Sequence, residues 1–572
     1  MQDETIHPLA FPNSRGQYNI ASYLIAPSVF VCSFVFIAVT MSRFVNPFDE
    51  GLILVGSARV LSGAVPYRDF YAIYGPAQFY MLAALFKLFG PSVLVERLWD
   101  LLIRTSTGLV VYLIIIRAWS RARAVIVVVL ISLWLSYFQN FGYPIFSCLL
   151  FALLSLYCLI PAYGGKRGIL PLAASGICSG ISILFRHDVG MATAVGNAFT
   201  LVLFHVTRDL DRSGQMRSLL FSISSYAGGI ALVVLPVFAL FVTSGAAHDM
   251  LVNLVLIPAR TYVRMRSEPF PTIADMTHDI LRLRRGWDSQ TPAVYLPILG
   301  VIAGLASLLA SGRKSRPAIA GNDNRRSPRR WLLLQLTVFS VLFFFKGWVR
   351  PSANQMALAI VPALVVIAVC GVEFQPRARK LLPALAVGCV AVISLAPLLD
   401  AASRFTKNLI WAADLPVPSY GFLAHLEREG GTCSPPAGLE QIRCFYVAED
   451  EVSAALYIQR HTSANEHILV ANGRNDKAVL QDVLFYFIAD RSPVTKWYQF
   501  DPGVQTTQEI QSDMIAELQK QRPRYVVLNS EWDNNNEPNE SAVSGSELLD
   551  RYIWSHYQPV AWFGEIRILK YS

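Results

Sequence analysis

The sequence predicts a polytopic α-helical membrane protein that carries a C-terminal α/β domain. Of its 572 residues, 53% are hydrophobic and only 16% are charged, whereas soluble domains carry about 25% charged residues. Apolar runs near the length of about 20 residues that crosses a bilayer recur along the first two thirds of the chain. After about residue 400 the charge rises and short strand-like runs alternate with helix-like ones, which predicts a separate folded domain.

The apolar runs predict about eleven membrane spans. Those in the first half cover residues 21–41, 94–116, 124–141, 145–161, 168–185 and 189–206. The others cover residues 218–243, 292–311, 331–345, 356–371 and 381–398. We therefore expect an N-terminal tail (1–20), a transmembrane domain (21–399) with two long loops (42–93 and 244–291), and the C-terminal domain (400–572).

Basic residues in alternate loops predict the orientation of the chain, because short cytoplasmic loops carry an excess of Lys and Arg. They follow the second, fourth, sixth, eighth and tenth spans, for example at Arg117, Arg121 and Arg123, at Lys166 and Arg167, between Arg313 and Arg330, and at Arg377 and Lys380. This pattern places the N-terminus in the cytoplasm and the C-terminal domain in the periplasm of a bacterial-type inner membrane. The same loops account for much of the net charge of +9, so no nucleic-acid partner is expected.

One apolar stretch has to be left out of the spans for this alternation to hold. Residues 71–90 are interrupted by Gly75, Pro76 and Lys87. We expect this stretch to lie flat on the outer membrane surface as an interfacial helix. The first apolar run, at 21–41, is not preceded by a basic leader with a small-residue cleavage site, so it is expected to be a retained anchor.

The C-terminal domain is expected to contain buried strands at His467–Ala471 and Tyr525–Leu528 and helices at Glu451–Gln459 and Thr506–Lys520. Its two cysteines, Cys433 and Cys444, lie close in sequence, and whether they form a disulfide stays open. The other six cysteines fall in apolar spans, where a thiol behaves as a small hydrophobe. No glycine-rich phosphate-binding motif is present, so nucleotide hydrolysis is not expected.

The first long loop holds the candidate catalytic residues. Asn46-Pro47-Phe48-Asp49-Glu50-Gly51 follows the first span and leads into an amphipathic helix, and an aromatic, proline-rich stretch follows from Val65 to Pro76. This order resembles the first outer loop of the GT-C superfamily of membrane glycosyltransferases, which includes protein O-mannosyltransferases and the aminoarabinose transferase of lipid A. The resemblance covers about the first 400 residues as a fold and is specific in motif only around Asp49 to Leu88.

The resemblance implies an enzyme that transfers a sugar from a polyprenyl-phosphate donor to an acceptor of the cell envelope, which is lipid A or lipopolysaccharide, a polysaccharide, or a protein. It implies that Asp49 is the base that deprotonates the acceptor hydroxyl, with Glu50 as its substitute. The alternative is that Asp49 only caps the helix that starts near Glu50, because Asp is a favoured cap and acids suit a helix start.

Further residues of the first loop, Arg68, Asp69 and Tyr74, are expected to contact the substrate. The chain departs from the aminoarabinose-transferase pattern here, since Tyr74-Gly75-Pro76 stands where Glu-Lys-Pro is expected. Any metal ligation by that Glu is therefore lost. A divalent cation, Mg²⁺ or Mn²⁺, would find obvious oxygen ligands only in Asp49, Glu50, Asp69 and Asp188, so metal use stays undecided.

The second long loop carries arginines on the outer side, against the inside rule. We expect Arg260 and Arg264, with Tyr262 between them, to contact the carrier phosphate, because guanidinium groups bind phosphate in bidentate fashion. The alternative is that these arginines only reach the lipid headgroups.

Charged residues at the outer ends of two spans complete the candidate site. Arg350 matches an arginine that the GT-C resemblance places after the ninth span, and Lys346 is either a second cation for the donor or a headgroup anchor. His187 and Asp188 follow the fifth span and either line the pocket or mark the membrane boundary.

Two other functional classes remain open at this point. A transporter or flippase of lipid-linked glycans would also use many spans and basic loops, but it predicts internal repeats and charges near the membrane midplane. A non-catalytic envelope scaffold would use the C-terminal domain to bind a partner. The expected partners of the enzyme are a polyprenyl-phosphate-linked sugar, an envelope acceptor and membrane lipid.

Overall fold

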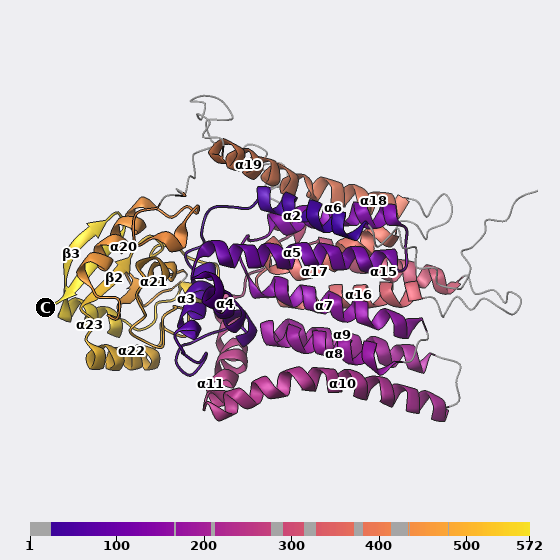
Figure 1. Cartoon of the computed structure of the whole chain (residues 1–572), viewed down its shortest axis with the longest axis horizontal. Helices are drawn as coiled ribbons and strands as arrows, with labels where there is room; N and C mark the ends of the chain where they lie inside the picture. Colours follow the sequence, from indigo (N-terminus) through magenta and orange to yellow (C-terminus); the bar gives the residue numbers. More distant parts are fainter. Residues whose placement is uncertain are drawn as a thin grey trace, which may run out of the picture.

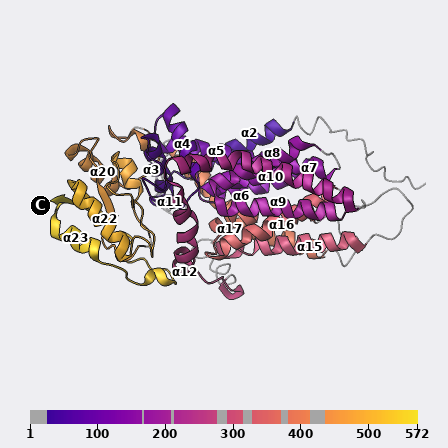
Figure 2. The same cartoon turned by 90° about the horizontal axis from the view of Figure 1, so that it is seen from below.

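The protein consists of a bundle of long helices and a smaller C-terminal part that covers one end of the bundle (Figure 1). The structure is a computed structural model and describes residues 25–164, 168–207, 212–275, 290–313, 328–370, 381–412, 433, 435–478 and 480–572. The bundle helices run along the long axis of the molecule, and both views place the C-terminal part beyond their ends (Figures 1 and 2).

The described bundle helices match the predicted apolar runs to within a few residues at most of their ends. They are α2 Ala26–Val39, α5 Val93–Ile116, α6 Arg121–Tyr137, α7 Pro144–Tyr163, α8 Ile169–Phe185, α9 His187–Val206, α10 Arg212–Thr243, α15 Leu296–Arg313, α16 Pro328–Trp348, α17 Ala353–Cys370, α18 Leu381–Ile393 and α19 Leu395–Ala412. Eight of the described helices are long and apolar enough to cross a membrane, and α2 and α8 are apolar but shorter. The length criterion thus supports fewer spans than the eleven or so that the sequence predicts.

The last predicted span, 381–398, differs from the structure. It is divided into α18 and α19, and α19 continues to Ala412, beyond the expected domain boundary near residue 400. Pro397 falls in the first turn of α19, where a proline is tolerated because its missing N–H would have no partner anyway. A helix start therefore lies within a run that reads as one apolar segment.

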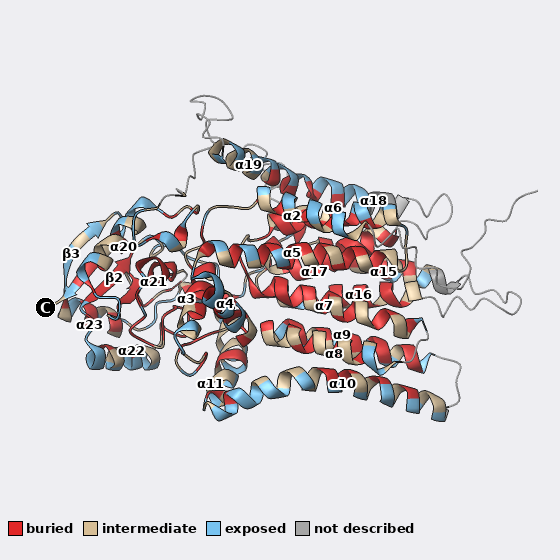
Figure 3. Ribbon diagram, in the orientation of Figure 1, coloured by how far each residue is buried: buried red, intermediate tan, exposed pale blue. Residues whose placement is uncertain are grey.

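Burial in the bundle fits a lipid-facing exterior. Helix α17 is the most deeply buried, with 83% of its 18-residue apolar stretch inside the protein (Figure 3). Only 17% of the corresponding stretch of α10 is buried. The exposed side chains of the outer helices are largely apolar, as at Ile126, Leu170 and Leu235. A soluble bundle would cover such a surface with polar residues, so this exterior favours a membrane.

Residues that flank two of the basic loops meet at one end of the bundle. The guanidinium of Arg329, in the first turn of α16, lies 5.4 Å from the ring centroid of Trp119, which follows α5. Helix α5 begins at the other end, beside the C-terminal part, where its first residues pack near Phe445. Trp119 and Arg329 therefore lie at the end of the bundle that faces away from the C-terminal part (Figure 1).

Helices α3 Asp49–Leu61 and α4 Pro76–Phe89 lie between the bundle and the C-terminal part and pack against each other (Figure 1). With 14 residues α4 is shorter than the about 20 residues that cross a bilayer, and the flat placement of the stretch 71–90 on the membrane surface stays a prediction. Gly75 precedes α4 and lies against the end of α8, where a Cβ would come within 2.2 Å of the carbonyl oxygen of Leu184. This close approach fixes the start of α4 on the bundle.

The C-terminal part is built on a four-stranded mixed sheet of order β1-β2-β4-β3. Strand β1 (Leu469–Asn472) pairs in parallel with β2 (Tyr525–Asn529), with Leu469 opposite Val526. Strand β4 (Ile566–Tyr571) pairs antiparallel with β2 and with β3 (Tyr557–Phe563). Its helices are α20 Glu449–His461, α21 Leu484–Ala489, α22 Gln508–Gln521 and α23 Leu548–His556. The two predicted strands and the two predicted helices are present, whereas the sequence analysis did not identify the β3–β4 hairpin.

The C-terminal part docks directly on α3. The N–H of Leu484 donates to the carbonyl of Pro47 at 2.8 Å, and the Tyr498 hydroxyl donates to the carbonyl of Leu52 at 3.3 Å. Gly51 permits this approach, because a Cβ there would lie 2.6 Å from the nitrogen of Leu484. Cys433 and Cys444 form a disulfide, which resolves the question that the sequence leaves open.

Candidate functional site

Asp49 is the first residue of α3, but it does not cap the helix. The side-chain oxygen of Asn46 accepts hydrogen bonds from the N–H groups of Phe48 (3.0 Å) and Asp49 (2.7 Å). These donors at the helix start are thus satisfied without the Asp49 carboxylate. That carboxylate instead lines a cavity of about 650 Å³.

The cavity lies where the bundle meets the C-terminal part. Its wall combines the start of α3, the junction of α8 and α9, the end of α16, the segment 257–268 and residues 501–504 of the C-terminal part. The acids that line it are Asp49, Asp188, Glu268 and Asp501. The cations that line it are Arg186, Arg266, Lys346 and Arg350. Five separate stretches of sequence therefore contribute charge to one cavity.

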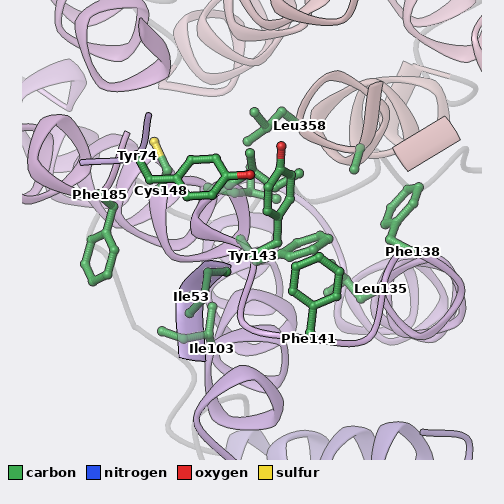
Figure 4. Packing of buried hydrophobic residues seen from close by; sticks show 14 of the residues in the cluster. Ile53, Tyr74, Ile103, Leu135, Phe138, Phe141, Tyr143, Cys148, Phe185 and Leu358 are labelled. Carbon is green, nitrogen blue, oxygen red and sulfur yellow. The ribbon is translucent and has the colours of Figure 1, made fainter. Parts of the chain in front are cut away.

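Two tyrosines form the wall beside Asp49. The hydroxyl of Tyr74 lies 3.4 Å from Oδ1 of Asp49 and donates to it, and the rings of Tyr74 and Tyr143 meet edge to face with centroids 5.7 Å apart (Figure 4). Burial raises the pKa of Asp49, while Arg266, Arg350 and the Tyr74 hydroxyl oppose that rise. The carboxylate is therefore a stronger base than an exposed aspartate.

Arg186, at the junction of α8 and α9, connects the tyrosines to a second acid. Its Nε lies 3.0 Å from Oδ1 of Asp188, and one of its terminal nitrogens donates to the Tyr143 hydroxyl at 3.2 Å. His187 also lines the cavity, so the predicted pair His187 and Asp188 lies at the site. The neighbouring Arg186 is not among the predicted site residues.

Lys346 and Arg350 enter the cavity from the end of α16. Lys346 donates to Oε1 of Gln355 and forms no ion pair with any carboxylate in the part of the chain that the structure describes. Arg350 pairs through its Nε with Oε1 of Glu268 at 3.0 Å. These two predicted cations therefore lie together, and Lys346 is the one whose charge is left available to a ligand.

A carboxylate from the C-terminal part binds two of the arginines. Oε1 of Glu537 accepts from Arg266 at 3.1 Å and also from Arg350. Arg266 is 3% exposed and has Asp501 at 3.8 Å as a further acidic neighbour. Arg266, Asp501 and Glu537 are not among the site residues that the sequence predicts.

Arg260 and Arg264 do not line the cavity, so the prediction that they converge with Asp49 is wrong. Residues four apart on a helix share a face, and Pro258, Tyr262 and Arg266 present one face of this helical segment to the cavity. Arg260 and Arg264 are also four apart and lie on a different face. Arg264 pairs with Glu540 at 2.9 Å and borders a second, polar hollow of about 900 Å³. Only Tyr262 of the predicted trio reaches the site.

Three residues of the first loop also lie outside the cavity. Glu50 is fully buried and holds the guanidinium of Arg97 with contacts of 2.6 and 2.7 Å, so it cannot substitute for Asp49 as a base. A charge buried this deeply needs a close partner, and Arg97 of α5 supplies it. Arg68 and Asp69 pair with each other at 2.7 Å on the surface. Of the predicted residues Glu50, Arg68, Asp69 and Tyr74, only Tyr74 contacts the Asp49 carboxylate in the described part of the chain.

Arginines engage three of the four predicted oxygen ligands of a divalent cation. Glu50, Asp69 and Asp188 each face an arginine, and they lie in different places around Asp49. Among the residues that the structure describes, no group of three His, Cys, Asp or Glu side chains is placed to hold a metal ion.

Comparisons with known proteins show a shared fold. No protein-family model matches the chain, and no curated protein matches its sequence. Two crystal structures of ArnT from Cupriavidus metallidurans, one bound to undecaprenyl phosphate and one in the apo state, superpose with TM-scores of 0.51 and 0.52 at 14% identity, over 97% of this chain and 98% of theirs. The oligosaccharyltransferase AglB from Archaeoglobus fulgidus, in complex with an inhibitory peptide and a dolichol-phosphate, gives 0.50 at 13% identity, over 97% of this chain and 75% of its own. The predicted resemblance to GT-C proteins is confirmed for the fold.

Proposed function

We propose that this protein is an integral membrane glycosyltransferase that takes a sugar from a polyprenyl-phosphate donor at the outer face of a bacterial inner membrane. One observation carries the proposal: Asp49, a carboxylate not used for capping, shares a cavity with a lysine and three arginines at the end of an apolar bundle. A base for a hydroxyl and cations for a phosphate are what this transfer needs.

The donor phosphate is proposed to bind between Lys346, Arg350 and Arg186. Lys346 has no acidic partner of its own among the described residues, and a desolvated cation gains most from an incoming anion. The prenyl chain would leave the cavity along the apolar helix surfaces that face lipid. The fold shared with ArnT, which has been crystallised with undecaprenyl phosphate, supports a lipid of this class.

The reaction is proposed as a single displacement at the anomeric carbon. The acceptor oxygen forms the new bond to this carbon while Asp49 takes the hydroxyl proton. The bond between the anomeric carbon and the phosphate oxygen breaks, and the electron pair leaves with the polyprenyl phosphate, whose charge the cations stabilise. Attack from the side opposite the leaving group inverts the configuration at that carbon.

The outer side is proposed from the charge of the loops. The ends of the bundle that carry Trp119 and Arg329 lie away from the cavity, and basic loops mark the cytoplasmic side. The cavity and the C-terminal part would then be periplasmic, where the acceptor is an envelope lipid, glycan or protein.

The test compares the wild type with Asp49→Asn in membrane vesicles supplied with labelled polyprenyl-phosphate sugars and envelope extract. The matched control is Asp69→Asn, which removes an exposed carboxylate of the same loop outside the cavity. We expect transfer by the wild type and the control, and loss of transfer by Asp49→Asn. Full activity of folded Asp49→Asn would refute the base assignment, and movement of lipid-linked glycan without transfer would show a flippase.

A further inference from the structure

The segment that follows β2 places one carboxylate at the edge of the cavity. Glu537 is about 270 residues away in sequence from Arg266, yet its Oε1 accepts from Arg266 (3.1 Å) and from Arg350. Its other oxygen, Oε2, accepts from the side chain of Asn539 at 3.1 Å. The carboxylate of Glu537 thus occupies two guanidiniums in the manner that a phosphate would.

Charge in the cavity makes this contact a competitor for an anion. The lining carries Arg186, Arg266, Lys346 and Arg350 against Asp49, Asp188, Glu268 and Asp501, so four cations face four acids. Glu537 adds a fifth carboxylate at the edge. While Glu537 stays in place, an anionic donor would enter a cavity with excess negative charge. Once Glu537 has left, the charges that line the cavity are balanced.

The segment that carries Glu537 is held loosely enough to move. Most residues from Glu531 to Val543 are exposed or only partly buried, and Ser541 is the one buried residue of this stretch. Its other described ion pair, between Glu540 and Arg264, is exposed on both sides and therefore worth little. Displacement of Glu537 would break its ion pairs with Arg266 and Arg350, and the phosphate would replace the pair with Arg350. The segment is also tied down by the hydrogen bond from Lys477 to Asn536 (2.6 Å), which lies on its exposed side.

We propose that Glu537 is an internal anion that holds Arg266 and Arg350 until the phosphate of a polyprenyl-phosphate donor displaces it. This inference rests on the proposed function and assigns the C-terminal part a role in admitting the donor. Binding then releases the segment 531–543 from the cavity edge, so donor entry and opening of this segment are coupled.

The first experiment measures binding of a short-chain polyprenyl phosphate to the full-length protein in detergent. Glu537→Gln keeps the shape of the side chain and removes its charge, so we expect binding about tenfold tighter than that of the wild type, because the competing closed state is weakened. Glu540→Gln is the matched control, since it removes an ion pair of the same segment outside the cavity, and its affinity should stay within about twofold of wild type. Equal or weaker binding by Glu537→Gln overturns the proposal.

The second experiment follows hydrogen exchange of the backbone in the wild type with and without the same lipid phosphate. Faster exchange over residues 531–543 on binding supports displacement, and slower or unchanged exchange overturns it. The two proposals fail differently. If wild type and Glu537→Gln bind the lipid equally well, only the role of Glu537 is refuted, whereas if neither binds it, the polyprenyl-phosphate donor itself is refuted.

Discussion

The Tyr74 hydroxyl donates a hydrogen bond to Oδ1 of Asp49 across 3.4 Å. Tyr74 stands where the aminoarabinose-transferase pattern has the Glu of Glu-Lys-Pro, so a phenol and not a second carboxylate faces the candidate base. A hydrogen-bond donor stabilises the charged form of a carboxylate, while the burial of Asp49 destabilises it. The basicity of Asp49 is set by the balance of these opposing effects.

Replacement of Tyr74 by Phe should move the pH dependence of transfer. The lost hydrogen bond raises the pKa of Asp49 further, and transfer needs the deprotonated carboxylate, so activity should begin to fall at a higher pH as the solution is acidified. We expect the acid limb of kcat/KM against pH to move to higher pH. Tyr80→Phe, at an exposed position of α4, is the control and should leave the pH dependence of kcat/KM unchanged.

Asp49→Asn should lower kcat by about 100- to 10,000-fold, the usual contribution of a general base. The affinity for polyprenyl phosphate should change little or improve, because the substitution removes a negative charge from the cavity. Steady-state kinetics together with direct lipid binding would check both parts. A parallel loss of binding and rate would indicate misfolding or a binding role for Asp49.

Lys346→Met should weaken binding of the lipid phosphate by about 10- to 100-fold, because it removes a charge-assisted contact worth about 1.5–3 kcal/mol. Arg264→Gln is the matched control, since this arginine is also cationic but lies outside the cavity. Titration of both variants with a short-chain polyprenyl phosphate would check the assignment. A larger loss for Arg264→Gln than for Lys346→Met would contradict the placement of the phosphate.

Glu50→Gln should destabilise the fold by about 3–5 kcal/mol, because it removes the closest anion of the buried Arg97 guanidinium and leaves only Glu96, at 3.5 Å. Arg68→Gln breaks the surface pair with Asp69 and should leave the stability almost unchanged. Thermal unfolding in detergent would compare the two. If Glu50→Gln kept its stability and lost only activity, Glu50 would have a catalytic role after all.

The resemblance in the first loop could be found in the sequence because its signal is local. Asp49 directly follows an apolar run, and the aromatic, proline-rich stretch after it contains Tyr74. Lys346 and Arg350 could be found in the same way, as cations at the end of a span. The sequence could not show which residue caps α3. Asn46, Asp49 and Glu50 all suit a helix start, and only their packing distinguishes them.

The sequence by itself determined the membrane-embedded bundle, the positions of most of its helices, and the strands β1 and β2, because these follow from the length and period of apolar runs. Only the tertiary structure decided which cations share a cavity with Asp49. The face that Arg264 or Arg266 presents depends on how one short helical segment packs, and Glu537 reaches the site from a distant part of the chain. Contacts between residues far apart in sequence leave no periodic trace along it, so folding alone brings these charges together.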